Sequence, residues 1–99
     1  MIKLLMSWDI QTGKEAEYME FVTREFTPQL MKLGIQPTEA WYTVVGNGPQ
    51  VLAGGITKDR NSMMSILESE EWGSLESKLL DYVRNYKYKV VPATGQFQL

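Results

Sequence analysis

The stretch YVRNYKYKVV, residues 82–91, decides the fold because a helical spacing of apolar residues gives way to alternation within it. Apolar residues recur at intervals of three and four from before this stretch into its first half, as in an amphipathic helix: Trp72, Leu75, Leu79, Val83 and Tyr86. This spacing predicts a helix that begins after a Ser69 cap and runs to about Tyr86. Downstream, Lys87 and Lys89 alternate with apolar residues, which predicts a final strand.

The same stretch mixes basic and aromatic residues, which is also the pattern of a nucleic-acid-binding surface. The whole chain has a net charge of −2 and carries no second basic cluster. Nucleic-acid-binding domains are usually basic, with lysine and arginine gathered on one face. The junction is therefore interpreted as architecture, and we expect neither a nucleic-acid nor a membrane partner.

The first third of the chain predicts a strand followed by a long helix. Residues Ile2 to Trp8 are mostly apolar and read as a strand, and the helical spacing begins after Lys14. Pro28 lies inside this helix, so we expect a kink, or a restart with Thr27 as the cap. Gly34 suits the left-handed residue that ends a helix.

The middle of the chain predicts two strands joined by a turn. Thr38–Val45 and Gln50–Thr57 are rich in β-branched and aromatic residues, and Asn47-Gly48 between them favours a hairpin. Gly54 and Gly55 interrupt the second of these strands, which indicates a bulge or the close approach of another group. Asp59 is placed to cap a short helix that follows.

The resulting order is strand, helix, strand, strand, helix, strand, which predicts an α+β ferredoxin-like domain over residues 1–99. Such a domain has a four-stranded antiparallel sheet with its helices on one face. Both faces of the predicted strands carry apolar residues, because adjacent positions such as Trp41 and Tyr42 are both aromatic. We therefore expect a second copy of the chain to cover the face that the helices leave bare, giving a homodimer.

Three segments resemble the dimeric α/β-barrel superfamily, in particular its antibiotic-biosynthesis-monooxygenase-like and NIPSNAP-like members: TGKEAEYMEF, TPQLMKLGIQP and SEEWGSLESKLLDYVRNYKYKVV. The resemblance implies a barrel made from two sheets, with a ligand pocket between the sheet and the helices. Members include cofactor-independent oxygenases, isomerases and haem-degrading enzymes. The haem-degrading members place a histidine on the second long helix, where this chain has Glu76 and no histidine, so haem is not expected.

The composition excludes several chemistries. The chain has no cysteine and no histidine, which removes thiolate and imidazole catalysis and the usual zinc and haem ligands. It has no phosphate-binding glycine motif and no run of acids typical of a calcium loop, so neither cofactor nor metal is expected. The N-terminus has too short an apolar run for a signal peptide, and a cytoplasmic location is the expectation.

Carboxylates and aromatic residues remain as candidates for function. Glu71 and Glu76 are the candidate general bases, since a carboxyl group in an apolar pocket has a raised pKa. The ordinary alternatives are a first-turn acid that complements the helix dipole for Glu71 and a solvated helix residue for Glu76. The candidate ligand-binding residues, each of which is alternatively an ordinary core or interface residue, are Met6, Trp8, Trp41, Tyr42, Tyr82 and Tyr88.

Two functions follow from these candidates. The first is a homodimeric binding protein whose apolar pocket takes an acyl chain or an aromatic molecule, with or without a carboxylate. The second is a cofactor-independent oxygenase or isomerase that uses a carboxylate as general base. A regulatory domain of the ACT type shares the order of elements and is a third reading, disfavoured because no catalytic domain is fused to this one.

Overall fold

The chain builds one antiparallel sheet with a helical layer on one side. The computed structural model describes residues 1–43 and 46–93. The elements in chain order are β1 (Ile2–Ile10), α1 (Glu15–Phe21), a π-helical segment η1 (Val22–Phe26), α2 (Thr27–Leu33), β2 (Gln36–Tyr42), β3 (Val51–Thr57), α3 (Arg60–Leu67), α4 (Glu70–Leu79) and β4 (Val83–Pro92).

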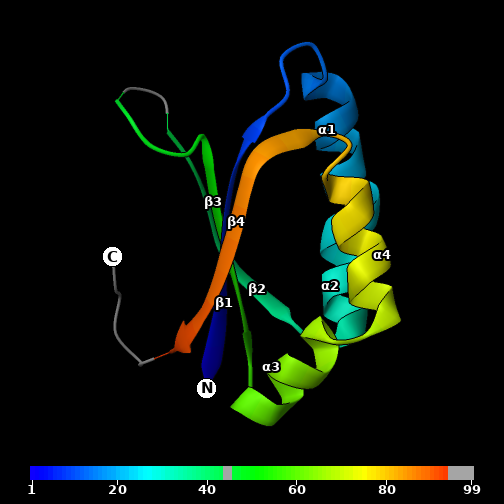
Figure 1. Cartoon of the computed structure of the whole chain (residues 1–99), viewed down its shortest axis with the longest axis vertical. Helices are drawn as coiled ribbons and strands as arrows, with labels where there is room; N and C mark the ends of the chain where they lie inside the picture. The colour runs from blue at the N-terminus through cyan, green and yellow to red at the C-terminus, as the bar shows by residue number, and fades with distance from the viewer. Residues whose placement is uncertain (44–45, 94–99) are drawn as a thin grey trace.

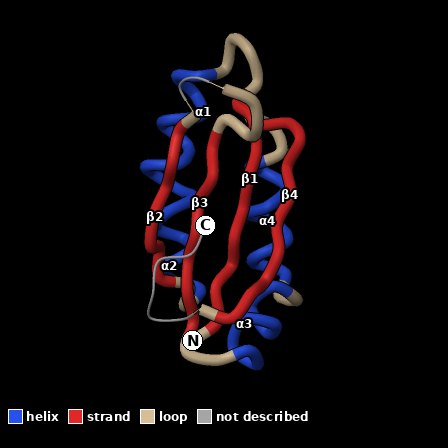
Figure 2. The backbone as a smooth tube through the Cα atoms, turned by 90° about the vertical axis from the view of Figure 1, so that its left-hand side faces the viewer, coloured by secondary structure: helices blue, strands red, loops and turns tan. Residues whose placement is uncertain are grey.

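The strand order across the sheet is β2-β3-β1-β4, and each neighbouring pair is antiparallel. Figure 1 shows the helices stacked along one side of the sheet. Figure 2 looks onto the other side, with the strands in front and the helices behind them. We call this second side the open face. The predicted ferredoxin-like fold is confirmed.

The core lies between the sheet and the helices, and β1 shows why. Leu4, Met6, Trp8 and Ile10 are buried, while the residues between them are only partly covered. This period of two directs one set of side chains toward the helices and the other set toward the open face. Burying each large apolar side chain contributes about 1.5–3 kcal/mol, so this row is a principal source of stability.

The first long helix is not a single regular helix. The Thr27 backbone N–H donates to the carbonyl of Val22, five residues back, which widens the turn before Pro28. Proline has no N–H and its ring crowds the carbonyl four residues before it, so a wider turn accommodates it. The predicted interruption at Pro28 is confirmed, but the predicted Thr27 cap is wrong because the residue is helical and makes no side-chain cap bond.

The second long helix ends earlier than its apolar spacing predicts. Helix α4 ends at Leu79 and not near Tyr86. The Tyr82 N–H closes a tight turn onto the Leu79 carbonyl, and the Tyr82 carbonyl accepts from the backbone of Gln11. Pairing with β1 therefore takes over the backbone at Val83, where the sequence still continues the helical spacing.

The middle of the chain agrees with its predictions in part. Strand β2 begins at Gln36 and ends at Tyr42, and the predicted strand residues Val44 and Val45 lie outside the described residues. The connection to β3 is longer than a two-residue hairpin, because the Thr43 N–H donates to the carbonyl of Gln50.

The remaining local predictions concern three glycines and two helix caps. The register of β2 against β3 shifts beside Gly54 and Gly55, and other side chains approach both glycines closely, as predicted. The Gly34 residue ends α2 in the left-handed region, with φ of 104°. The Asp59 and Ser69 side chains cap α3 and α4, as predicted.

Candidate functional site

A small cavity lies between the sheet and the first helical segments. Its volume is about 100 Å³. Its lining comes from β1, β2 and β3 on one side and from α1, η1 and α2 on the other, and includes Met6, Trp8, Tyr18, Phe26, Leu30 and Tyr42. Most of these side chains are apolar or aromatic, so the cavity suits an apolar occupant.

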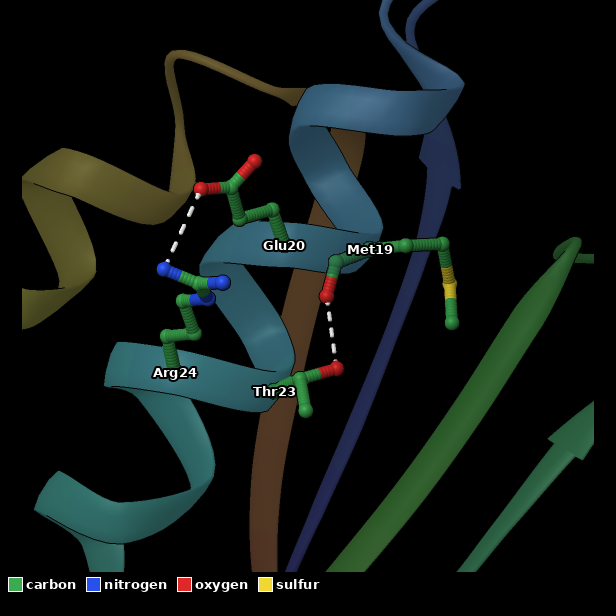
Figure 3. A network of polar contacts seen from close by, with 4 residues as sticks. All are labelled: Met19, Glu20, Thr23 and Arg24. Atoms are coloured by element: carbon green, nitrogen blue, oxygen red, sulfur yellow. Dashed lines mark hydrogen bonds and ion pairs between the residues drawn. The ribbon is translucent and has the colours of Figure 1, made fainter.

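The widened helix forms one wall of this cavity. Val22 and Phe26, the two ends of the π-helical segment, both line it. Figure 3 shows the turn that leads into this segment, where the Thr23 hydroxyl donates to the Met19 carbonyl at 2.7 Å. π-Helical turns within α-helices are frequent at functional sites, so this irregularity marks the same region as the cavity.

Two polar groups are buried in the cavity wall and form a hydrogen bond with each other. The Trp8 indole N–H donates to the Tyr18 hydroxyl at 2.9 Å, and both residues are almost fully buried. Burial raises the pKa of the Tyr18 phenol above its ordinary value; the Trp8 hydrogen bond opposes the shift and the neighbouring Tyr42 adds to it. Tyr18 therefore keeps its proton at neutral pH.

Tyr42 stands at the mouth of the cavity. Its side chain is 50% exposed, and its hydroxyl donates to the sulfur of Met19 at 3.5 Å. In Figure 3 the Met19 side chain extends from α1 toward the strands, on the side of the helix away from Glu20 and Arg24. The mouth is thus framed by a phenol from β2 and a thioether from α1.

The structure brings three of the predicted ligand residues to one site. Met6, Trp8 and Tyr42 all line the cavity. Trp41 pairs with Leu52, and adjacent strand residues point to opposite sides of a sheet, so it lies on the open face.

The other two predicted ligand residues lie elsewhere. Tyr82 stacks on Phe21 with ring centroids 5.0 Å apart. Tyr88 meets Trp72 edge-on at 6.5 Å. Neither tyrosine is among the residues that line the cavity.

The two candidate carboxylates are not brought together at the cavity. Glu71 is exposed in the first turn of α4, where it borders a shallow hollow between the helices with Glu25 and Lys78. Glu76 is half-buried and accepts a hydrogen bond of 2.7 Å from the Tyr86 hydroxyl. Burial, and then the Glu76 hydrogen bond and charge, raise the pKa of the Tyr86 phenol. Neither carboxylate lines the cavity.

Sequence reasoning missed Tyr18 and Tyr86 as site candidates. Tyr18 belongs to the helical apolar spacing after Lys14, and that spacing alone gives no reason to single it out, yet a buried tyrosine hydroxyl and a buried indole N–H usually find partners. That rule gives the one signal that could have paired Tyr18 with Trp8. Tyr86 was assigned to the helix, which hid its position on β4 facing α4.

The open face has its own pattern of apolar and charged side chains. Leu52 and Trp41 are 41% and 54% exposed there. Lys3 and Glu39 form an ion pair of 2.5 Å across β3, passing over Gly54, whose missing side chain leaves the room they need. A shallow hollow beside this centre is bordered by Leu5, Ser7, Leu52, Lys87 and Lys89, among others.

The described part of the chain shows neither a cluster of metal ligands nor a membrane-spanning helix. Within residues 1–43 and 46–93, no three acidic side chains gather in a way that could hold a metal ion. The helices in those ranges are all too short or too polar to cross a bilayer.

Comparison with known proteins supports the fold and goes no further. No family model matches the chain, and no curated protein matches it. Several solved structures do match the chain in fold. An uncharacterised NIPSNAP domain protein from Burkholderia xenovorans has a TM-score of 0.72 at 14% identity, with 99% of this chain and 100% of that chain covered.

Two other solved structures give the same result. A NIPSNAP family protein from Agrobacterium tumefaciens has a TM-score of 0.70 at 20% identity, over 95% of this chain and 93% of that one. An antibiotic-biosynthesis-monooxygenase-like protein from Nitrosomonas europaea has a TM-score of 0.65 at 14% identity, over 94% and 98%. The chain therefore shares the ferredoxin-like fold of the NIPSNAP-like and monooxygenase-like proteins that its sequence resembles.

Proposed function

We propose that this chain, with the fold of the NIPSNAP-like and monooxygenase-like proteins, is a homodimeric binding protein for a small apolar molecule. The observation that carries the proposal is the cavity of about 100 Å³ between the sheet and the first helices. Its aromatic walls offer contact area, and its few polar groups are already paired.

The size of the cavity favours one part of the predicted ligand class. A cavity of about 150 Å³ in another protein accommodates a benzene ring. The present cavity is smaller than that one, so it accommodates at most a single aromatic ring and not a long acyl chain or a polycycle. Burying about 150 Å² of apolar ligand surface would yield roughly 4 kcal/mol before the cost of association is subtracted.

The ligand proposal is tested by thermal shift with single-ring compounds such as toluene. We expect these to raise the Tm, whereas ATP and magnesium ions should leave it unchanged. Ala53 lines the cavity, so Ala53→Val places two methyl groups inside it and should reduce the shift. Circular dichroism checks that this variant folds. A Tm that responds to ATP and not to ring compounds would overturn the proposal.

The dimer proposal rests on the open face. Exposed apolar side chains gather there, and the ion pair between Lys3 and Glu39 removes two isolated charges from its centre. Covering unpaired charges is costly, whereas a paired set can be buried at less cost. A standard interface of about 1,600 Å² in total is enough to cover such a face.

Sedimentation equilibrium at micromolar concentration tests the dimer. We expect a dimer for the unaltered chain and a monomer for Leu52→Lys, which puts a charge on the open face. Leu80→Lys is the matched control, because Leu80 is similarly exposed but follows α4 on the helical side. A monomeric unaltered chain would contradict this part of the proposal.

A second candidate function is a cofactor-independent enzyme with a carboxylate base. The observation that favours it is the half-buried Glu76 carboxylate, which the Tyr86 hydroxyl holds in place with a hydrogen bond of 2.7 Å, since a positioned carboxylate can accept a proton from a substrate. The test is base-catalysed exchange of the α-protons of a cyclic ketone with deuterated water, followed by NMR. Glu76→Gln should lower the exchange rate by about two to four powers of ten.

Glu71→Gln separates the two candidate carboxylates in the same assay. If Glu76 is the base, the exposed Glu71 can be replaced without loss of rate. Rates that are equal to the buffer rate in the unaltered chain would remove the enzymatic alternative altogether.

A further inference from the structure

The polar groups along the cavity wall differ in what they donate to and in how far they lie from the surface. The Trp8 N–H donates to the Tyr18 oxygen, so the Tyr18 hydroxyl has its own hydrogen left to donate elsewhere. Tyr42 also lines the cavity, and its phenol adds to the raised pKa of Tyr18. Trp8 and Tyr18 are sealed from water at 2% and 1% exposure, whereas Tyr42 reaches the surface. The polar groups Trp8, Tyr18 and Tyr42 therefore follow one another from the core to the mouth of the cavity.

The last donor in this series has a poor acceptor. Within the described part of the chain, the Tyr42 hydroxyl donates only to the Met19 sulfur, at 3.5 Å. A thioether sulfur is a weak acceptor, and Met19 is itself 48% exposed on a flexible side chain. An oxygen atom brought to the same place would accept this hydrogen bond more strongly.

The charges around the cavity decide which kind of oxygen fits. No lysine or arginine is among the residues that line it. A carboxylate placed here would lose its hydration without gaining a cation, which is costly. A neutral carbonyl oxygen needs only one donor, and Tyr42 supplies one.

We propose that the cavity selects neutral aromatic carbonyl compounds, such as aryl ketones and aldehydes, and that the Tyr42 hydroxyl donates to the carbonyl oxygen in place of the Met19 sulfur. The proposal rests on the proposed binding function, and it assigns Tyr42 as the residue that determines specificity. It also narrows the ligand class, because neither hydrocarbons nor carboxylate ions gain this hydrogen bond.

Two ligands of matched shape test the proposal. Acetophenone and isopropylbenzene differ in having a carbonyl oxygen or a methyl group at the same place. One hydrogen bond contributes about 0.5–1.5 kcal/mol, so in calorimetry the unaltered chain should bind acetophenone about twofold to twelvefold more tightly than Tyr42→Phe does. The affinity for isopropylbenzene, which cannot accept this hydrogen bond, should be the same in both. Met19→Leu is the matched control, since it removes the present acceptor and keeps the donor, and it should bind acetophenone no more weakly than the unaltered chain does.

The carbonyl carbon provides a second readout that does not depend on affinity. In acetophenone labelled with ¹³C at the carbonyl, a donated hydrogen bond moves the resonance downfield. We expect this shift with the unaltered chain and with Met19→Leu, and its absence with Tyr42→Phe.

The outcomes separate this inference from the binding function beneath it. If Tyr42→Phe binds acetophenone as tightly as the unaltered chain does, the inference is overturned and the binding function stands. If Tyr42→Phe weakens both compounds equally, the tyrosine hydroxyl acts on the cavity and not on the carbonyl, and the assignment of Tyr42 is wrong. If neither compound binds, both the inference and the proposed function fail.

Discussion

Replacing Tyr18 by phenylalanine tests whether the cavity wall is dry. The substitution removes only the hydroxyl that accepts from the Trp8 indole N–H at 2.9 Å. Trp8 is 2% exposed, so no bulk water replaces the lost acceptor. Leaving a buried donor unsatisfied costs about 1–3 kcal/mol. For a domain of this size each kcal/mol lowers the Tm by about 4–8 °C, so we expect a loss of at least about 4 °C.

The assay is calorimetric unfolding of Tyr18→Phe beside a matched control. Tyr82→Phe also removes one phenol hydroxyl, but the Tyr82 hydroxyl makes no hydrogen bond to the described residues and its ring keeps its stacking on Phe21. The control should change the Tm by less than about 2 °C, as expected for a substitution away from buried polar networks. An equally small change in Tyr18→Phe would mean that water reaches the indole, and the argument for an apolar cavity would then fail.

Two further predictions concern the sheet. Gly55→Ala should cost about 1–3 kcal/mol of stability because its methyl group would meet the buried Ile35 side chain. Gly54→Ala should cost under about 1 kcal/mol, because its methyl group would displace the flexible ends of the open-face ion pair and otherwise come into tight contact with the Thr38 hydroxyl. Denaturant unfolding of both variants gives the comparison, and equal costs would contradict it. Hydrogen bonds from Asn85 and from a backbone N–H lower the pKa of Asp9 below its ordinary value of 3.8, so its contribution to stability is present above that pH and is lost as the pH falls through the lowered value. The Tm of Asp9→Asn should therefore lie below that of the unaltered chain near neutral pH and approach it as the pH falls below 3.8, and a constant difference across that range would refute the linkage.

The order of elements and the layers of the fold could be predicted from the sequence because each element carries its own period. The end of α4 could not. Val83 and Tyr86 continue the helical spacing by three, yet Asn85 adopts a left-handed φ of 56° between them, beside a shift in the register of β1 against β4. The apolar residues of an irregular strand can thus be spaced as in a helix. Only the pairing of Val83 with Ile10 shows that this segment is a strand.

The sequence predicted several individual residues of the candidate site, but it did not predict which of them lie together around one cavity. Trp41 and Tyr42 were both expected to contact the ligand, although neighbours on a strand point to opposite faces. Both sets of side chains on β2 are exposed or only half-covered, so the sequence gives no signal for which set faces the helices. The pairing of Trp8 with Tyr18 joins a strand to a helix, and no local pattern specifies such a contact.

The six methionines allow the most direct test of where a ligand binds. Met6 lines the cavity and Met19 stands at its mouth, whereas Met1, Met31 and Met64 are exposed and are not among its lining residues. The measurement is a methyl NMR titration of methionine-labelled protein with acetophenone, with NOEs from the ring protons. We predict that the Met6 and Met19 methyl signals shift and show NOEs while Met1, Met31 and Met64 stay unchanged. Shifts confined to those three methyl groups, with none at Met6, would contradict the proposed binding site.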